Sequence, residues 1–81
     1  MAEIHLWGSL AAAAGGRPVV EIAAKDIREL FRKLVEQYPA TQALIDQGVA
    51  VSIDGTIWRD TWSQPLPEEA EIFLLPRIAG G

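Results

Sequence analysis

The sequence predicts an α+β fold in which a mixed β-sheet of four or five strands wraps around one long helix. Two observations indicate this architecture: residues 27–38 carry apolar side chains at helical spacing, and short apolar runs typical of strands lie on both sides of them. With 81 residues the chain has room for one small hydrophobic core. We therefore expect a single domain over residues 1–81.

The first two strands are expected at residues 3–7 and 18–22. Side chains alternate between two faces in the first strand, with Ile4 and Leu6 on one face and His5 and Trp7 on the other. Pro18 suits the start of the second strand because proline has no N–H for a sheet ladder. Between the two strands, the alanine-rich residues 9–14 predict a short helical turn.

The helix at residues 27–38 is defined by a single apolar stripe. Its members recur at three- and four-residue intervals: Ile27, Leu30, Phe31, Leu34, Val35 and Tyr38. Asp26 followed by Glu29 predicts a capping box, which stabilises a helix start by about 1 kcal/mol. Pro39 disfavours helical backbone at the residue before it, so we expect the helix to stop at Tyr38.

The remaining elements follow in the second half of the chain. We expect a short helix at 40–47, strands at 49–53 and 56–58 joined by the hairpin signal Asp54-Gly55, an irregular loop at 59–67, and a last strand at 71–75 ended by Pro76. An un-knotted path through these elements places the first and last strands parallel and side by side at the sheet centre. This order of elements is that of a β-grasp fold.

Composition excludes several classes of function. The net charge is −4 and no segment concentrates Lys and Arg, which argues against a nucleic-acid partner. No apolar run approaches the ~20 residues that span a bilayer, and the first residues lack the pattern of a signal peptide. We therefore expect a cytoplasmic protein with no membrane partner. The chain has no cysteine, which removes disulfides, thiolate metal sites and thiol catalysis.

The ionisable side chains indicate no catalytic or metal site. His5 is the only histidine and is interpreted as a residue on a strand face. The acidic residues of the C-terminal half lack the ligand rhythm of a calcium loop, and several lie in predicted turns: Asp54, Asp60, Glu68, Glu69 and Glu71. We expect a protein that is not an enzyme and that binds no metal or cofactor itself.

The most informative pattern is at the end of the chain. An apolar strand is followed by Pro76, and the sequence then ends in Gly80-Gly81. Because glycine has no Cβ and is conformationally permissive, a terminal Gly-Gly can thread a narrow channel and leave its carboxylate open to attack. We expect a flexible tail at residues 77–81. A frayed end without a function is the alternative.

At these residues the chain resembles the MoaD/ThiS family of ubiquitin-like sulfur carriers, and residues 49–81 look most like MoaD, the small subunit of molybdopterin synthase. The similarity rests on four stretches: Val51-Ser52-Ile53-Asp54-Gly55, Pro65-Leu66, Glu71-Ile72-Phe73-Leu74-Leu75-Pro76 and the final Gly80-Gly81. The ending at residues 78–81 looks equally like ThiS, the thiamine-pathway carrier. The resemblance implies the same β-grasp fold.

The resemblance also implies a function. An adenylating enzyme of the ubiquitin-activating type, similar to MoeB or ThiF, would use ATP to convert the Gly81 carboxylate to an acyl-adenylate. A sulfur donor would then displace AMP and leave a thiocarboxylate, since no cysteine could hold the sulfur as a persulfide. The acceptor would be bound by a synthase subunit similar to MoaE or its equivalent. Gly80 and Gly81 would supply the reactive end, in molybdopterin biosynthesis or a related ThiS-like pathway.

The predicted sheet leaves apolar side chains on the face away from the helix. Trp7, Phe73 and Leu75 would form a contiguous patch there, and such a patch is typical of a protein-docking surface. Alternatively, the loop after the fourth strand covers them through Trp62. Arg77, between the last strand and the tail, is either solvated or pairs with an acidic groove of the adenylating partner.

Two other functions remain open. A ubiquitin-like protein modifier would use the same adenylate but would end in an isopeptide bond between Gly81 and a lysine of its target. A non-catalytic β-grasp binding module would not need Gly80-Gly81 at all. The sequence does not distinguish among these functions, or among the pathways and sulfur acceptors of a carrier.

Overall fold

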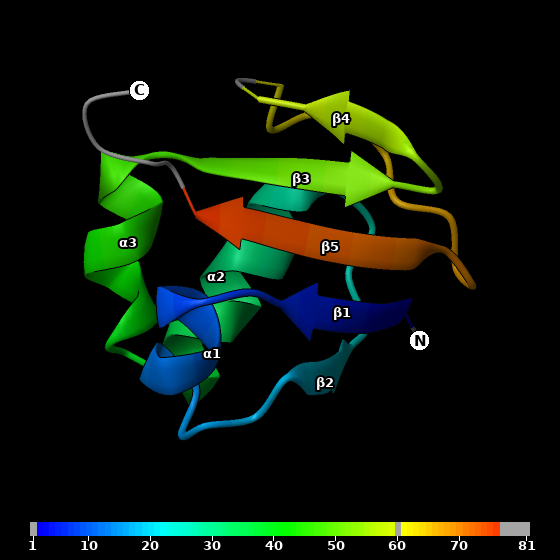
Figure 1. Ribbon diagram of the computed structural model, residues 1–81. Coiled ribbons are helices and arrows are strands. Elements are labelled where there is room, and N and C mark those ends of the chain that lie inside the picture. Colours follow the sequence, from blue (N-terminus) through cyan, green and yellow to red (C-terminus); the bar gives the residue numbers. More distant parts are fainter. Residues whose placement is uncertain (1, 60, 77–81) are drawn as a thin grey trace.

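The computed structural model describes residues 2–59 and 61–76 of the chain and has the predicted β-grasp fold (Figure 1). Its elements are, in order, β1 (Ala2–Leu6), α1 (Ser9–Ala13), β2 (Val19–Ile22), α2 (Ile27–Gln37), α3 (Thr41–Gln47), β3 (Val49–Ile53), β4 (Thr56–Trp58) and β5 (Glu71–Pro76). Five strands form one sheet, α2 packs behind it, and α1 and α3 lie at the end where β1 and β5 finish.

The last strand of the chain occupies the centre of the sheet. The strand order is β2-β1-β5-β3-β4, in which β5 runs parallel to β1 and antiparallel to β3. In the register of these pairs, Ile72 lies opposite Ile4 and Leu74 lies opposite Val51. The predicted parallel pairing of the first and last strands is confirmed, and β5 makes contact along both of its edges.

The hydrophobic core fills the space between α2 and one face of the sheet. The predicted stripe supplies the helix side, with Ile27, Leu30, Phe31 and Leu34 buried and with Val35 and Tyr38 partly buried against them. The sheet supplies alternate residues, of which Ile4, Ile72 and Leu74 have no exposed surface. This alternation leaves the odd-numbered positions of β1 and β5 on the opposite face of the sheet.

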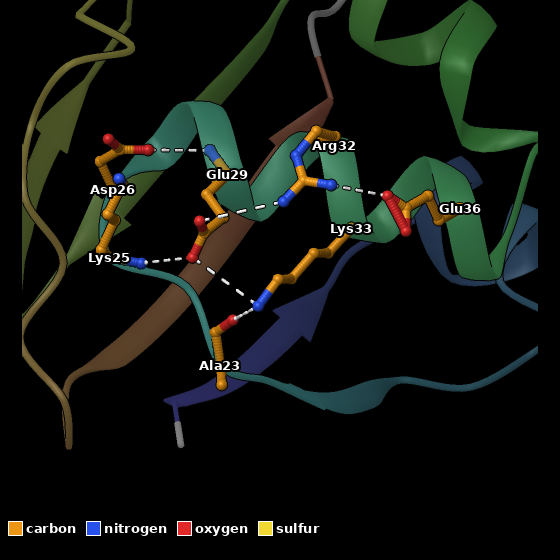
Figure 2. Close-up of polar contacts among 7 residues, drawn as sticks. All are labelled: Ala23, Lys25, Asp26, Glu29, Arg32, Lys33 and Glu36. Atoms are coloured by element: carbon orange, nitrogen blue, oxygen red, sulfur yellow. Dashed lines mark hydrogen bonds and ion pairs between the residues drawn. The ribbon is translucent and has the colours of Figure 1, made fainter.

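The start of α2 is capped as the sequence predicts, and Figure 2 shows the contacts. The Glu29 backbone N–H donates to Asp26 Oδ1 over 2.8 Å, and the Lys25 N–H donates to Glu29 Oε1 over 3.1 Å. On the exposed face of the helix, Arg32 pairs with Glu36 over 2.7 Å, and the Lys33 ammonium donates to the Ala23 carbonyl. Exposed ion pairs of this kind contribute little to stability, so the cap is the more important interaction.

The irregular loop between β4 and β5 is bonded to the same helix start. The N–H groups of Ile27 and Arg28 donate to the carbonyls of Gln64 and Trp62 over 3.2 and 2.9 Å. These are two of the N–H groups that the first turn of a helix leaves without an intrahelical partner. The loop therefore lies on the helix side of the molecule, where the Trp62 ring packs edge-on against Phe31 at 5.1 Å between centroids.

Four strand boundaries differ from the prediction by one residue. β1 begins at Ala2 instead of Glu3, and β2 begins at Val19 instead of Pro18. β1 ends at Leu6, so Trp7 lies in the turn that follows, where its carbonyl accepts the Leu10 N–H over 3.1 Å. Pro76, predicted to follow β5, is its last residue and lies opposite Val49 of β3. The prolyl ring is tolerated because β1 has already ended opposite Leu74, so no strand on that side needs an N–H from residue 76. Within the described residues, every helix is too short to cross a lipid bilayer.

Candidate functional site

The face of the sheet turned away from α2 is the surface that carries the predicted site residues. Figure 1 looks onto this face, and α2 lies behind it. The strand register brings side chains from all five strands into one row on it. From one edge to the other the row consists of Val19, His5, Phe73, Ser52 and Ile57. A second, shorter row is formed by Leu75 and its partner Ala50.

Three aromatic rings meet at the centre of this face. The Phe73 ring stacks on His5 with 4.5 Å between centroids, and Trp7 meets Phe73 edge-on at 6.5 Å. Trp7 is 57% exposed, whereas Phe73 and Leu75 are half-buried by their neighbours in the sheet. We call Trp7, Phe73 and Leu75 the apolar patch. The structure therefore brings the predicted docking residues of the described chain to one face.

The alternative in which Trp62 covers this patch is wrong. The loop that carries Trp62 is bonded to the start of α2, and its indole packs on Phe31, on the other side of the sheet. Sequence reasoning left the exposed and the covered patch open because it had no information on which side of the sheet the loop passes. The hydrogen bonds from the first turn of α2 decide this question.

The open face also carries exposed apolar side chains, outside the patch, that the sequence prediction missed. Val19 and Ile57, on the two edge strands, are 39% and 53% exposed and widen the apolar surface on either side of Phe73. Their period-two alternation was visible in the sequence, but only the register shows that both share the row of Phe73. Apolar side chains thus lie at both edges of the sheet as well as at its centre, with His5 and Ser52 between them.

The apolar patch lies at the end of the sheet where the described chain leaves β5. Pro76, the last described residue, packs beside Gly8, where a Cβ would lie 3.8 Å from the Pro76 Cγ. Gly8 follows Trp7 directly, and its φ of +57° belongs to the region that glycine adopts at little cost. The predicted tail, with Arg77, Gly80 and Gly81, lies outside the described residues.

The opposite end of the same face is acidic. Glu3 lies opposite both Glu21 of β2 and Glu71 of β5, and all three side chains are exposed. Asp54, at the β3–β4 turn, continues this end of the face, and its Oδ1 accepts the Glu71 N–H over 3.0 Å. In the described part of the chain, no three acidic or histidine side chains are arranged to hold a metal ion.

The fold and this face define a class: a small ubiquitin-like protein with a β-grasp sheet that is open on one side. Comparison with protein families then identifies the chain as a member of the ThiS family, whose model matches residues 4–81. The resemblance to the MoaD/ThiS sulfur carriers is confirmed. Comparison with curated proteins gave no significant match.

Solved structures share the fold over almost the whole chain. The small archaeal modifier protein 1 of Methanosarcina acetivorans superposes with a TM-score of 0.80 at 22% identity, over 99% of this chain and 95% of that chain. A putative molybdopterin converting factor subunit 1 of Pyrococcus furiosus gives 0.79 at 14% identity, over 95% and 97%. A chain of the BexX/CysO complex of Amycolatopsis orientalis gives 0.81 at 15% identity, over 100% of both chains.

Proposed function

We propose that this protein is a sulfur carrier that bears sulfur as a thiocarboxylate on Gly81. The observation that carries the proposal is the family match, which runs to residue 81 and so includes Gly80-Gly81 at the end of the matched segment. The sequence has no cysteine, so a side-chain persulfide cannot hold the sulfur, and the proposal places it on the Gly81 carboxylate.

The chemistry proceeds in three steps. The Gly81 carboxylate attacks the α-phosphate of ATP, which forms an acyl-adenylate and releases pyrophosphate. A persulfide sulfur from a donor protein then attacks the acyl carbon, AMP leaves, and reductive cleavage of the sulfur–sulfur bond by a thiol leaves the thiocarboxylate. Activation is needed because AMP is a far better leaving group than the oxide of a free carboxylate. The partner enzyme supplies the ATP site, and the carrier acts as its co-substrate without catalysis of its own.

The open face is the docking surface in this proposal. Trp7, Phe73 and Leu75 lie at the end of the sheet that leads to the tail, so a partner that binds them is positioned to receive Gly80-Gly81. The partners are an adenylating enzyme similar to MoeB or ThiF and an acceptor subunit similar to MoaE or its equivalent. Arg77, between the patch and the glycines, would pair with an acidic groove of the adenylating enzyme.

Intact-mass spectrometry tests the proposal directly. The chain, with Gly81 as its free C-terminus, is incubated with a ThiF/MoeB-type adenylating enzyme of the same organism, Mg-ATP and a persulfide donor. We expect the mass change of one oxygen replaced by sulfur, and no such change in a variant that lacks Gly81. If the folded chain neither supports pyrophosphate exchange by the enzyme nor gains sulfur, the carrier function is refuted and the β-grasp binding module remains.

A protein modifier is the second candidate, and the similarity to small archaeal modifier protein 1 favours it. It needs the same adenylate, but the acyl group passes to a lysine ammonium of a target protein, after loss of a proton, and AMP leaves. Tryptic digestion of cell extracts, which cuts after Arg77, would then yield lysines that carry a branched Ile-Ala-Gly-Gly remnant. Among the carrier pathways we propose molybdopterin synthesis, in line with the resemblance of residues 49–81 to MoaD, and restored molybdoenzyme activity in a strain without its own MoaD would test that choice.

A further inference from the structure

The open face of the sheet is divided along the strand direction into an apolar half and an acidic half. The apolar patch of Trp7, Phe73 and Leu75 lies at the end where the described chain finishes. The row of Glu21, Glu3 and Glu71, which we call the glutamate row, lies at the opposite end, where β1 and β5 begin (Figure 1). The two halves are therefore parts of one continuous surface with a fixed direction.

The glutamate row is unfavourable for the chain by itself. Like charges directly opposite each other on neighbouring strands destabilise a sheet, and Glu3 faces a glutamate on both sides. Among the described residues, the lysine and arginine ion pairs go to Glu29 and Glu36 on α2, not to this row. Of the side chains that the structure describes, the basic one within 4 Å of the row is the His5 ring, whose Nε2 lies 3.7 Å from Glu3 Oε2. The row is thus a concentration of charge that the rest of the described chain does not neutralise.

The surface at this end is also hollowed. Glu3, Glu69, Ala70 and Glu71 line an open hollow, which places three carboxylates around one depression. The neighbouring Asp54 carboxylate is held in place by the Glu71 N–H. The described carboxylates are not arranged to hold a metal ion, whereas the guanidinium or ammonium group of a protein side chain can reach such a hollow from outside and contact several carboxylates at once.

We propose that the open face docks the adenylating partner through two matched regions, an apolar surface over the patch and a group of Arg or Lys side chains over the glutamate row. This inference rests on the proposed function and specifies the chemistry of the partner. The row and the end of β5 are separated by the residues from Glu71 to Pro76, a length of about 16 Å at ~3.3 Å per residue. The partner therefore carries its cationic group about 16 Å from the entrance that receives the tail.

The two regions together determine the orientation of docking. If the carrier bound in the reverse direction, the cationic side chains of the partner would face Trp7 and Leu75 and the glutamates would face its apolar surface, so that charges would be desolvated without partners. The correct direction points β5, and with it the tail, at the active site. Because the charges are exposed, their attraction acts mainly on the association rate and weakens as salt is added.

The test compares two double variants that each remove two negative charges. Glu3→Gln/Glu71→Gln removes two of the three charges of the row, and Glu36→Gln/Asp46→Asn removes two exposed charges from α2 and α3 as the control. The probe is the ThiF/MoeB-type adenylating enzyme of the same organism, and carrier-dependent ATP–pyrophosphate exchange gives KM and kcat at low and high salt. We expect the row variant to raise KM by about tenfold at low salt, less at high salt, with kcat unchanged. Its urea midpoint should equal or exceed that of the unmodified chain, because the repulsion is relieved.

Each other outcome overturns part of the argument. An unchanged KM in the row variant, with normal exchange by the unmodified chain, refutes the cationic contact and leaves the carrier function intact. An equal rise of KM in the control variant assigns the effect to net charge and refutes the role of the row. Absence of exchange with the unmodified chain refutes the proposed function itself, and this inference with it.

Discussion

Trp7 and Trp62 allow docking to be tested separately from folding. Both indoles are partly exposed, but Trp7 lies on the open face beside Phe73, whereas Trp62 packs on Phe31 of the core. Replacement of Trp7 by alanine should weaken binding to the adenylating partner and leave the fold nearly unchanged. Replacement of Trp62 should do the reverse. The pair is a matched control because each variant loses the same side chain.

The magnitude follows from the exposed surface. With 57% of Trp7 exposed, a partner can cover at most about 140 Å² of a side chain of about 250 Å². At about 25 cal/mol per Å² this corresponds to about 3.5 kcal/mol, and incomplete coverage and lost side-chain freedom reduce it to about 2 kcal/mol. We therefore expect Trp7→Ala to raise KM for the carrier about 30-fold, and to lower the free energy of unfolding by less than about 1 kcal/mol.

The assay is pyrophosphate exchange over a range of carrier concentrations, with urea denaturation of the same samples. Trp62→Ala should lower the free energy of unfolding by about 2 kcal/mol, because the contact between a partly buried aromatic ring and Phe31 is lost. Its KM should change less than threefold, which corresponds to less than about 0.6 kcal/mol of binding free energy. The reasoning is refuted if Trp7→Ala leaves KM unchanged, or if both variants change KM and stability in the same proportion.

Further predictions concern the fold that holds the open face. Asp26→Ala should lower stability to urea by about 1 kcal/mol because the Glu29 N–H loses its acceptor, whereas Asp26→Asn keeps one; equal losses would contradict the cap. Leu74→Ala, at a fully buried site of the central strand, should cost about 2–5 kcal/mol in thermal unfolding, and a loss below about 1 kcal/mol would show that the core closes over the site. Gly55→Ala should cost about 1–2 kcal/mol through backbone strain alone, because φ is +92° and nothing lies within 4 Å of the added Cβ; Gly55→Asn should cost less, and a reversed order would refute that explanation.

The sequence predicted most of the fold because its signals are local. The stripe from Ile27 to Tyr38 and the capping pair Asp26 and Glu29 each depend on residues a few positions apart, and both are confirmed. The error at the end of β5 occurred because the end of a strand depends on its neighbours in the sheet as well as on the residues around it. Pro76 can remain in β5 because β1 has already ended beside it. The end of β1 lies about seventy residues earlier in the chain, so no pattern near Pro76 could show it.

The candidate site was predictable only in part. Alternation along β5 was enough to place Phe73 and Leu75 on one face, whereas Trp7 lies in the turn after β1 and reaches that face through its contact with Phe73. The stacking of His5 on Phe73 and the alignment of Glu21, Glu3 and Glu71 depend on the register between strands, which no local pattern determines. The same applies to Trp62, since the side on which its loop passes depends on hydrogen bonds to the start of α2.

The central place of β5 has a consequence for how the protein is made. The strand that completes the sheet is the last one to be synthesised, and it joins β1 through a pairing between residues near the two ends of the chain, such as Glu3 and Glu71. Such non-local pairings form late and slowly in folding. A chain that stops short of β5 lacks Ile72 and Leu74 and so cannot close its core. Quality-control proteases that degrade unfolded chains would therefore remove such incomplete products, and the molecules that survive in the folded state are those in which translation has passed through β5.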